Sequence, residues 1–353
     1  MTKACARPCG CSILPPELLR RIALRGSVRQ RDAALATLAT DHTLRLARAT
    51  YQLLASAPQR GLLGVPVAAK QRTVYDAHGR ETLPGKAVRA EGGRAVKDVT
   101  VNEAYDGLGA TFDFFADVYD RNSIDDEGLH LDATVHYGKR YDNAFWNGRQ
   151  MVFGDGDGDL FNRFTISLDV IAHELTHGVT GDEARLVYLG QAGALNESIS
   201  DVFGSLVKQY ARNETAAKAD WLIGKGLFTS KIHGIALRSM KAPGTAFDDP
   251  LLGRDPQPST MAGYVRTSTD NGGVHINSGI PNHAFYLAAI ALGGYAWEKA
   301  GRIWYETLRD HRLKPTATFR QFARQTVQNA AQLFGTAERQ AVASAWNAVG
   351  IKT

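Results

Sequence analysis

Two histidines four residues apart, His173 and His177, constrain this 353-residue chain more than any other feature. The apolar residues 168–172 precede them, a pattern typical of a buried helix. On a helix, positions i and i+4 share one face, so the two imidazoles can converge on a single metal ion. Glu174 lies beside them without being a ligand itself. The alternative is an ordinary helix that carries two His and a Glu.

A second helix-compatible stretch, residues 194–201, supplies acids at the same helical spacing. Catalytic zinc takes three protein ligands and keeps a fourth position open. Glu197 has the charge and setting to be the third ligand, beside the H-E-x-x-H pattern of zinc peptidases, in which the Glu acts as general base. Asp201, one turn further, can accept the outer N–H of a ligand histidine. The alternative is a solvated helix with two acids.

Asn196-Glu197-x-x-Ser200-Asp201, at this distance from H-E-x-x-H, resembles the thermolysin family. The similarity covers roughly residues 70–350, with the motifs in family order. It implies a zinc-dependent neutral endopeptidase with one catalytic Zn²⁺, acting on protein or peptide substrates. The fold class that it implies is α+β, a two-lobe metallopeptidase with a β-rich N-terminal lobe, a helical C-terminal lobe and the active-site cleft between them.

Several other segments resemble substrate-binding and catalytic parts of that family. Residues 143–148 and 151–158 resemble its edge strand and loop, where the Asn143 side chain and the Ala144 carbonyl would hold the substrate backbone. Residues 237–240 match the segment whose arginine, here Arg238, contacts a substrate carbonyl. Residues 270–279 match the segment with the family's transition-state histidine, here His275. Tyr188 falls where the family has a tyrosine facing the oxyanion.

Taken singly, a tyrosine in an apolar stretch is usually core and a lone arginine is usually a surface charge, so these roles rest on the resemblance. By that resemblance, Tyr188 and a protonated His275 would donate hydrogen bonds to the developing oxyanion. Asp270 would orient His275. Glu174 would take a proton from the attacking water and deliver it to the leaving amine.

The resemblance also implies an apolar pocket after the scissile bond. A bulky hydrophobic residue on the amine side of the cut is therefore expected. The positions that correspond to the pocket are all apolar: Phe161, Phe164, Val170, Ile223 and Leu237.

Calcium is expected to be absent. Asp155, Asp157 and Asp159 do not form an EF-hand loop, because Leu160 and Ile166 stand where Gly and Glu are required. At the family's paired calcium site Asp169 and Asp220 remain, but Lys208, Leu222 and Lys225 occupy other ligand positions. Lys208 is expected to approach Asp169. Lysines that point to solvent would leave calcium binding equally absent.

Charge is concentrated at the N-terminus. Residues 1–60 contain ten Lys or Arg and three acids, a net charge of +7, whereas the whole chain carries +5, so residues 61–353 carry −2. The body therefore gives no support for a nucleic-acid partner. No window has the apolar length of a membrane span. By family resemblance the chain is expected to be secreted, although residues 1–14 lack the apolar stretch of a signal peptide, and a cytoplasmic location is the alternative.

The first 55 residues are predicted to be a separate helical unit. Pro15 and Pro16 open a helix with an apolar stripe, and Ala and Leu repeat at helical spacing over residues 31–54. This leader resembles the short prosegment of protealysin-like members of the family, which makes the chain's own prosegment a partner and self-processing an expectation; a permanent helical arm is the alternative. Cys5, Cys9 and Cys11 are interpreted as incidental thiols rather than a metal site.

Three domains are predicted: a prosegment over 1–55, a β-rich catalytic lobe over 62–190 that ends in the zinc-binding helix, and a helical lobe over 191–353. Strands and turns are expected over residues 70–165, including a strand at 97–101. Helices are expected over 169–181, 194–212, 280–292, 296–310, 319–334 and 337–349. Alternative functions are a zinc aminopeptidase of the H-E-x-x-H group and a catalytically silent scaffold of the same fold.

Overall fold

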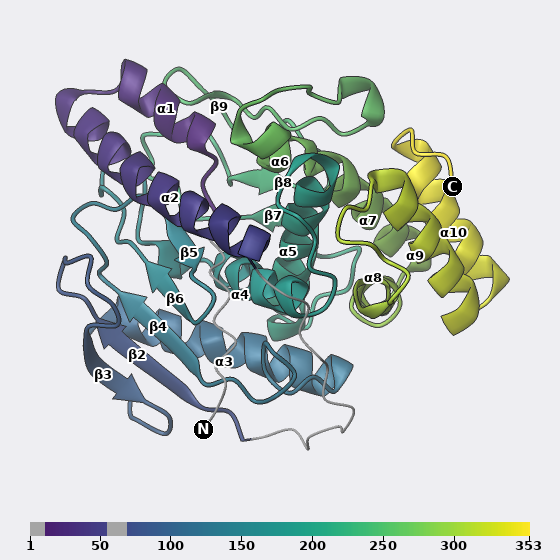
Figure 1. The fold of residues 1–353 in the computed structure, drawn as a ribbon, viewed down its shortest axis with the longest axis horizontal. Coiled ribbons are helices and arrows are strands. Elements are labelled where there is room, and N and C mark those ends of the chain that lie inside the picture. Colours follow the sequence, from purple (N-terminus) through teal and green to yellow (C-terminus); the bar gives the residue numbers. More distant parts are fainter. Residues whose placement is uncertain (1–10, 55–68) are drawn as a thin grey trace. The chain divides into compact units, whose positions relative to one another are not determined.

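A computed structural model describes residues 11–54 and 69–353, and it divides into two compact units, residues 1–179 and 180–353 (Figure 1). Helix α4 (Leu168–Asp182) runs through the boundary. Cys5 and Cys9, interpreted above as incidental thiols, lie outside the described residues. Among the described helices, none is long and apolar enough to cross a membrane.

The first unit is built on a six-stranded sheet with the strand order β1-β5-β6-β4-β2-β3. Strands β2 and β4, and β4 and β6, run parallel, and the other neighbours are antiparallel. The strands are β1 (Cys11–Ser12), β2 (Arg72–Asp76), β3 (Lys86–Ala90), β4 (Leu131–Val135), β5 (Ala144–Trp146) and β6 (Gln150–Phe153). A 3₁₀ turn, η1 (Phe164–Ile166), leads into α4.

Helix α3 (Val99–Tyr119) packs on this sheet at β2 and β4 (Figure 1). The prediction of a strand at residues 97–101 is therefore wrong. The Asp98 side chain accepts a hydrogen bond from the backbone N–H of Thr100 and so caps the first turn of the helix, which outweighs the strand preference of the β-branched residues that follow.

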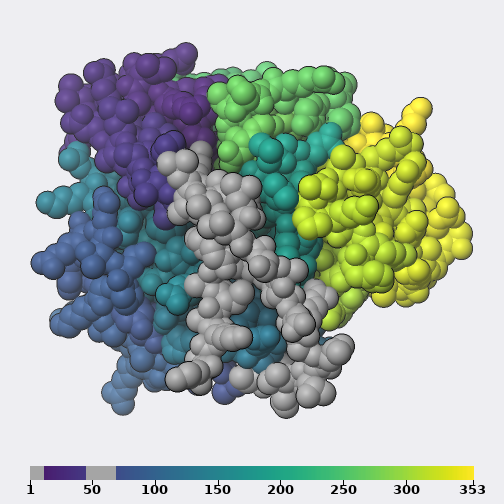
Figure 2. All heavy atoms as spheres, in the orientation of Figure 1, coloured from purple at the N-terminus to yellow at the C-terminus, as the bar shows by residue number. Residues whose placement is uncertain are grey.

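Two helices lie between β1 and β2 in the chain, as the leader pattern predicts: α1 (Pro16–Arg25) and α2 (Val28–Leu54). Pro16 opens α1, and Leu18, Leu19 and Ile22 bury its apolar stripe. Between β1 and α1, Ile13 and Leu14 are completely buried. Figure 2 shows the two helices (purple) packed beside the blue and teal residues of their own unit. The N-terminal segment is thus integrated into this unit.

The second unit is mainly helical. Its long helix α5 (Gly190–Ala211) is buried along nearly its whole length, as expected of a helix that is apolar on most sides. The last four helices, α7 to α10, pack around the stacked rings of Trp304 and Trp346. The remaining elements are β7 (Leu222–Ile223), β8 (Arg238–Ser239), β9 (Asp248–Asp249), β10 (Gly253–Arg254), η2 (Met261–Gly263), α6 (Asp270–Asn277), α7 (Gly279–Leu292), α8 (Ala300–Arg309), α9 (Phe319–Leu333) and α10 (Thr336–Ala348).

The predicted helices agree with α4, α5, α7, α8, α9 and α10 to within four residues at each end. Helix α6 was not predicted. Its first turn is irregular, since Asn271, Gly272 and Gly273 have φ values of 50°, 85° and 75°. Two consecutive glycines meet this backbone requirement at little steric cost.

Candidate metal centre

Helix α4 presents His173 and His177 on one face, as their spacing requires. Their Nε2 atoms lie 3.1 Å apart, and both side chains are buried. Two imidazole nitrogens that face each other at this distance cannot both donate a proton to the other, so at least one lone pair points at its neighbour. A cation that accepts both lone pairs would satisfy this arrangement.

Glu197 on α5 completes a group of candidate metal ligands. One donor atom each from His173, His177 and Glu197 lies within 4.8 Å of the other two, and all three side chains are buried. Two imidazoles and one carboxylate are a donor set that zinc accepts in catalytic sites. The residues present therefore fit the metal that the sequence pattern predicts.

Glu174 lies between the two histidines in sequence and is fully buried. Its Oε2 accepts a hydrogen bond of 3.1 Å from the backbone N–H of Trp146 on β5. This contact fixes the Glu174 carboxylate relative to β5. The sequence gives no sign of it, because a backbone donor has no residue signature.

Tyr188, His275 and Asp270 form a hydrogen-bonded group in the second unit. The Tyr188 hydroxyl donates to Glu197 Oε1 and lies 3.3 Å from His275 Nε2. The Nδ1 atom of His275 lies 2.7 Å from Asp270 Oδ1, and its backbone N–H donates to Asp270 Oδ2 at 2.9 Å. The left-handed turn at 271–273 brings Asp270 back onto His275. Asp270 therefore holds His275 both by its imidazole ring and by its backbone N–H.

Asp201 binds Arg238 through two hydrogen bonds, from Nε to Oδ2 at 2.9 Å and from Nη2 to Oδ1 at 2.8 Å. Asn282 on α7 donates to the same Oδ2 at 2.8 Å. Arg238 is 3% exposed and Asp201 is completely buried. Burial acts to lower the pKa of Arg238, but the charge of Asp201 raises it above its usual value. Asn282 is a further member of this cluster that the motifs did not indicate.

Asn143 and Ala144, which are predicted to hold the substrate backbone, already bind the chain's own N-terminal segment. The backbone of β1 pairs antiparallel with β5. Just after β1, the N–H of Ile13 donates to the Ala144 carbonyl at 3.2 Å, and the N–H of Leu14 donates to Asn143 Oδ1 at 2.9 Å.

Asp41 of α2 also binds Asn143, through the amide nitrogen of its side chain. Its carboxylate accepts hydrogen bonds from Asn143 Nδ2 at 2.7 Å and from the Tyr141 hydroxyl at 2.6 Å. Asp41 is 2% exposed. A buried acid in the leader went unnoticed in the sequence, because nothing there shows which residues α2 would face.

The apolar residues predicted to shape specificity are all buried. Phe161 and Phe164 lie in the first unit with ring centroids 6.0 Å apart, and Val170 is on α4. Ile223 on β7 and Leu237 next to β8 belong to the second unit.

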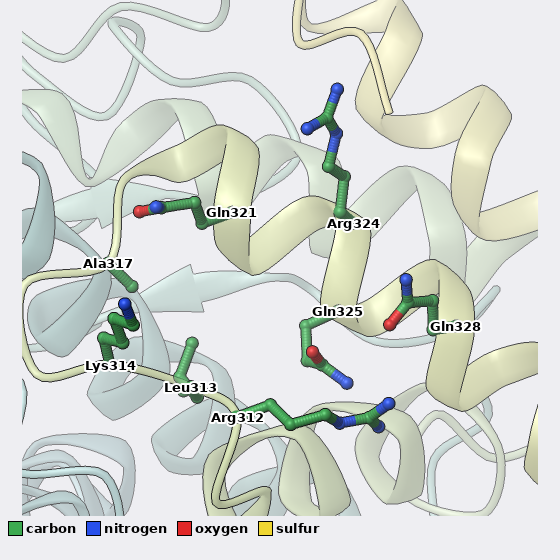
Figure 3. A pocket seen from close by; sticks show the side chains of 8 residues that line it. All are labelled: Arg312, Leu313, Lys314, Ala317, Gln321, Arg324, Gln325 and Gln328. Atoms are coloured by element: carbon green, nitrogen blue, oxygen red, sulfur yellow. The ribbon is translucent and has the colours of Figure 1, made fainter.

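A cavity of about 190 Å³ in the second unit, around α9, lies apart from all these residues (Figure 3). Arg312, Lys314 and Arg324 line it together with three glutamines, and none of the predicted site residues does. The hydrogen-bonded groups described above, rather than this cavity, define the candidate site.

Comparison with known proteins identifies the family of the chain. The model of the thermolysin metallopeptidase catalytic domain matches residues 44–181, and that of the thermolysin metallopeptidase alpha-helical domain matches residues 184–351. An extracellular metalloprotease of Pectobacterium carotovorum subsp. carotovorum is 56% identical over 97% of this chain and 96% of its own length. Protease PrtS of Photorhabdus sp. (strain Az29) is 49% identical over 96% of this chain and 92% of its own length.

Among solved structures, the precursor of protealysin, a metalloproteinase from Serratia proteamaculans, superposes with a TM-score of 0.88. It is 56% identical in sequence, and the match covers 97% of this chain and 99% of that one. The two-part fold, the buried His-His-Glu group and these similarities lead to one conclusion: the chain belongs to the thermolysin family of zinc-dependent metalloendopeptidases.

Proposed function

We propose that this protein is made as a self-processing precursor of a neutral zinc endopeptidase that cleaves peptide bonds on the amine side of bulky hydrophobic residues. The observation that carries the proposal is the buried group of His173, His177 and Glu197, with Glu174 fixed on the same helix. Family membership supports the reaction class.

His173, His177 and Glu197 would hold the zinc ion, which supplies Lewis-acid polarisation of the scissile carbonyl and of the attacking water. Glu174 takes a proton from that water and delivers it to the leaving amine. Its buried position and the hydrogen bond from the backbone N–H of Trp146 keep one carboxylate oxygen oriented for this transfer. Tyr188 and a protonated His275 donate hydrogen bonds to the oxyanion that develops, and Asp270 stabilises the imidazolium. Asp201 and Asn282 hold the Arg238 guanidinium in place to meet a substrate carbonyl.

Substrate binding would occur by strand addition on β5. The pairing of β1 with β5, and the contacts of Ile13 and Leu14 with Ala144 and Asn143, support this idea, since an extended segment already occupies these donors and acceptors. The buried apolar side chains of Phe161, Phe164, Val170, Ile223 and Leu237 support a preference for a hydrophobic residue after the scissile bond.

Internally quenched peptides test the activity and its preference. The mature protein should cleave a peptide with Leu or Phe after the scissile bond at least about tenfold faster, in kcat/KM, than the same peptide with Asp there, because a charge would be buried in an apolar pocket. A zinc chelator should abolish cleavage, and added zinc should restore it. Release of an aminoacyl fluorophore in place of peptide cleavage would indicate an aminopeptidase, and no turnover with zinc bound would indicate a silent scaffold.

Residues 1–55 would form the prosegment, with 62–190 and 191–353 as the two catalytic lobes. Because leader residues occupy Asn143 and Ala144, they must leave before substrate can bind there. We expect the wild-type chain to lose this segment during purification, so that the mature chain begins between residues 48 and 61, part of which lies outside the described residues. The Glu174→Gln variant should remain full length when purified alone.

Intact mass measures both outcomes. A trace of wild-type enzyme added to the Glu174→Gln precursor distinguishes cleavage within a molecule from cleavage between molecules. Wild-type protein that is fully active while it retains residues 1–353 would contradict the prosegment assignment.

The position of Lys208 supports the expected absence of calcium. Its Nζ, on a side chain that is only 4% exposed, donates to Asp220 Oδ1 at 2.9 Å and to the Leu222 carbonyl. Burial acts to raise the pKa of Asp220, but Lys208 and Lys225 lower it below its usual value. The ammonium thus occupies oxygen atoms that calcium would need. The approach of Lys208 to Asp169 stays a prediction.

Thermal unfolding of the Glu174→Gln protein in excess calcium and in a calcium-selective chelator should give nearly coincident curves. A rise in the midpoint with calcium that disappears in an Asp220→Ala variant would overturn this proposal.

Secretion is proposed because the Pectobacterium relative is described as extracellular. Assay of culture medium and of cell lysate for the full-length and shortened chains would test it.

A further inference from the structure

Asp142, directly before the substrate-binding Asn143, is a buried acid that the proposed mechanism does not use. It is 1% exposed, and neither of its carboxylate oxygens has a hydrogen-bond partner among the described residues. A buried acceptor without a donor loses its hydration without compensation, and an ionised one costs far more. The local structure therefore needs a positive or proton-bearing group at this carboxyl.

Asp157 is the acid next to it. The backbone N–H of Gly154 donates to the Asn143 carbonyl at 3.0 Å, and that of Gly156 donates to the Tyr141 carbonyl at 3.3 Å, so the loop after β6 runs alongside residues 141–143. Asp157, which is 3% exposed, follows directly in this loop.

The two oxygens of Asp157 differ. Its Oδ1 accepts backbone hydrogen bonds from Asp159, Leu160 and Phe161 at 2.7–3.1 Å, whereas its Oδ2 has no hydrogen-bond partner among the described residues. The Asp157 carboxylate is thus satisfied on one side only, and it lies beside the Asp142 carboxyl, which the backbone N–H of Asp157 approaches without making a hydrogen bond of normal geometry. A single proton on Asp142 would supply the missing donor, as in other pairs of neighbouring acids.

The electrostatics around Asp142 favour that proton. Burial, and then the negative charge of Asp157, raise the pKa of Asp142 well above its ordinary value, and the Asp157 backbone N–H and Arg140 offset this only in part. Arg29 of α2 donates to the Asp157 carbonyl at 3.5 Å.

Helix α2 covers the pair. Thr37 Oγ1, which is fully buried, accepts a hydrogen bond of 3.0 Å from the Asp142 backbone N–H. Asp41 binds Tyr141 and Asn143 on either side of it. Further along the helix, Gln30 donates to Asp159 at 2.6 Å. Movement of α2 away from these residues would let water reach an ionised Asp142.

We propose that Asp142 and Asp157 share one proton in the full-length chain, and that loss of this proton loosens the hold of α2 on the substrate-binding strand. The consequence for activation rests on the proposed prosegment role of residues 1–55. The closed precursor would then weaken, and would release its leader more readily, as the pH rises.

The direction of the pH effect follows from the raised pKa of Asp142. Between the pKa of an unfolded aspartate and the raised pKa of Asp142, the closed state binds more protons than the opened one, so the closed state weakens as the pH rises across that interval. Replacement of Asp142 by Asn keeps the shape and supplies a permanent N–H donor, and it should remove this dependence.

The test uses the full-length protein with Glu174→Gln, which prevents self-cleavage, with and without Asp142→Asn. The rate of limited trypsin cleavage after Arg29 and Arg31 in α2 reports opening of the helix. Between pH 6 and pH 10, the rate in the parent should rise relative to the Asp142→Asn protein, by up to about tenfold per pH unit while one proton is linked to opening.

Asp159→Asn is the matched control. It removes a charge where Gln30 of α2 contacts this loop, and it leaves the carboxyl groups of Asp142 and Asp157 in place. It should follow the pH dependence of the parent. His136, whose pKa is raised to about 9 mainly by its hydrogen bond with Asp155, titrates in the same range, but it is present in every variant and cancels in the comparison.

Parallel pH profiles for the parent and Asp142→Asn would overturn the proposal. Infrared spectra give a second measurement that does not depend on how the variant folds: the parent should show the C=O stretch of a protonated buried carboxyl at pH 6 and lose it at high pH, and absence of this band would also overturn the proposal. Neither measurement requires that the leader be removed in the wild-type protein. A shared proton without self-processing would therefore refute the prosegment assignment alone.

Discussion

Glu174→Gln should lower kcat/KM for peptide cleavage by at least about a thousandfold while the protein still binds zinc. The amide keeps the shape of the side chain and can still accept the hydrogen bond from Trp146, but it cannot take a proton from the attacking water. Zinc content by metal analysis should stay at one ion per chain, because Glu174 is not among the ligands.

Glu127→Gln is the matched control, since it makes the same chemical change at an exposed position of the same unit. It should leave kcat/KM unchanged. A Glu174→Gln enzyme that cleaves casein as fast as the wild type would show that another group acts as the base.

The sequence predicted most about the site where its chemistry is local. The spacing of His173 and His177 needs only a helix, and the buried helix α4 provides it. The tight link between Asp270 and His275 depends on a left-handed turn, for which Gly272 and Gly273 are a visible signal. In both cases the residues that define the geometry lie within a few positions of one another.

Contacts between distant segments were not predictable in the same way. Asp41 and Tyr141 are a hundred residues apart, and no periodicity shows that they meet. The pairing of β1 with β5 involves only two residues on each strand, too few for a strand pattern. Helix α3 was missed for a different reason, since its first residues favour strands and only the cap at Asp98 indicated a helix.

Asp201→Asn should cost about 3–5 kcal/mol of unfolding free energy, the largest stability effect that we expect from an isosteric change in this chain. The substitution leaves the buried Arg238 guanidinium without its charged partner and replaces one acceptor oxygen by a donor that faces it. Urea unfolding in the Glu174→Gln background measures the cost without self-digestion. Glu338→Gln breaks the pair with Lys299, which is 45% exposed, and should lower the free energy of unfolding far less than Asp201→Asn does. Equal losses for the two variants would show that the buried pair contributes no more than a surface pair does.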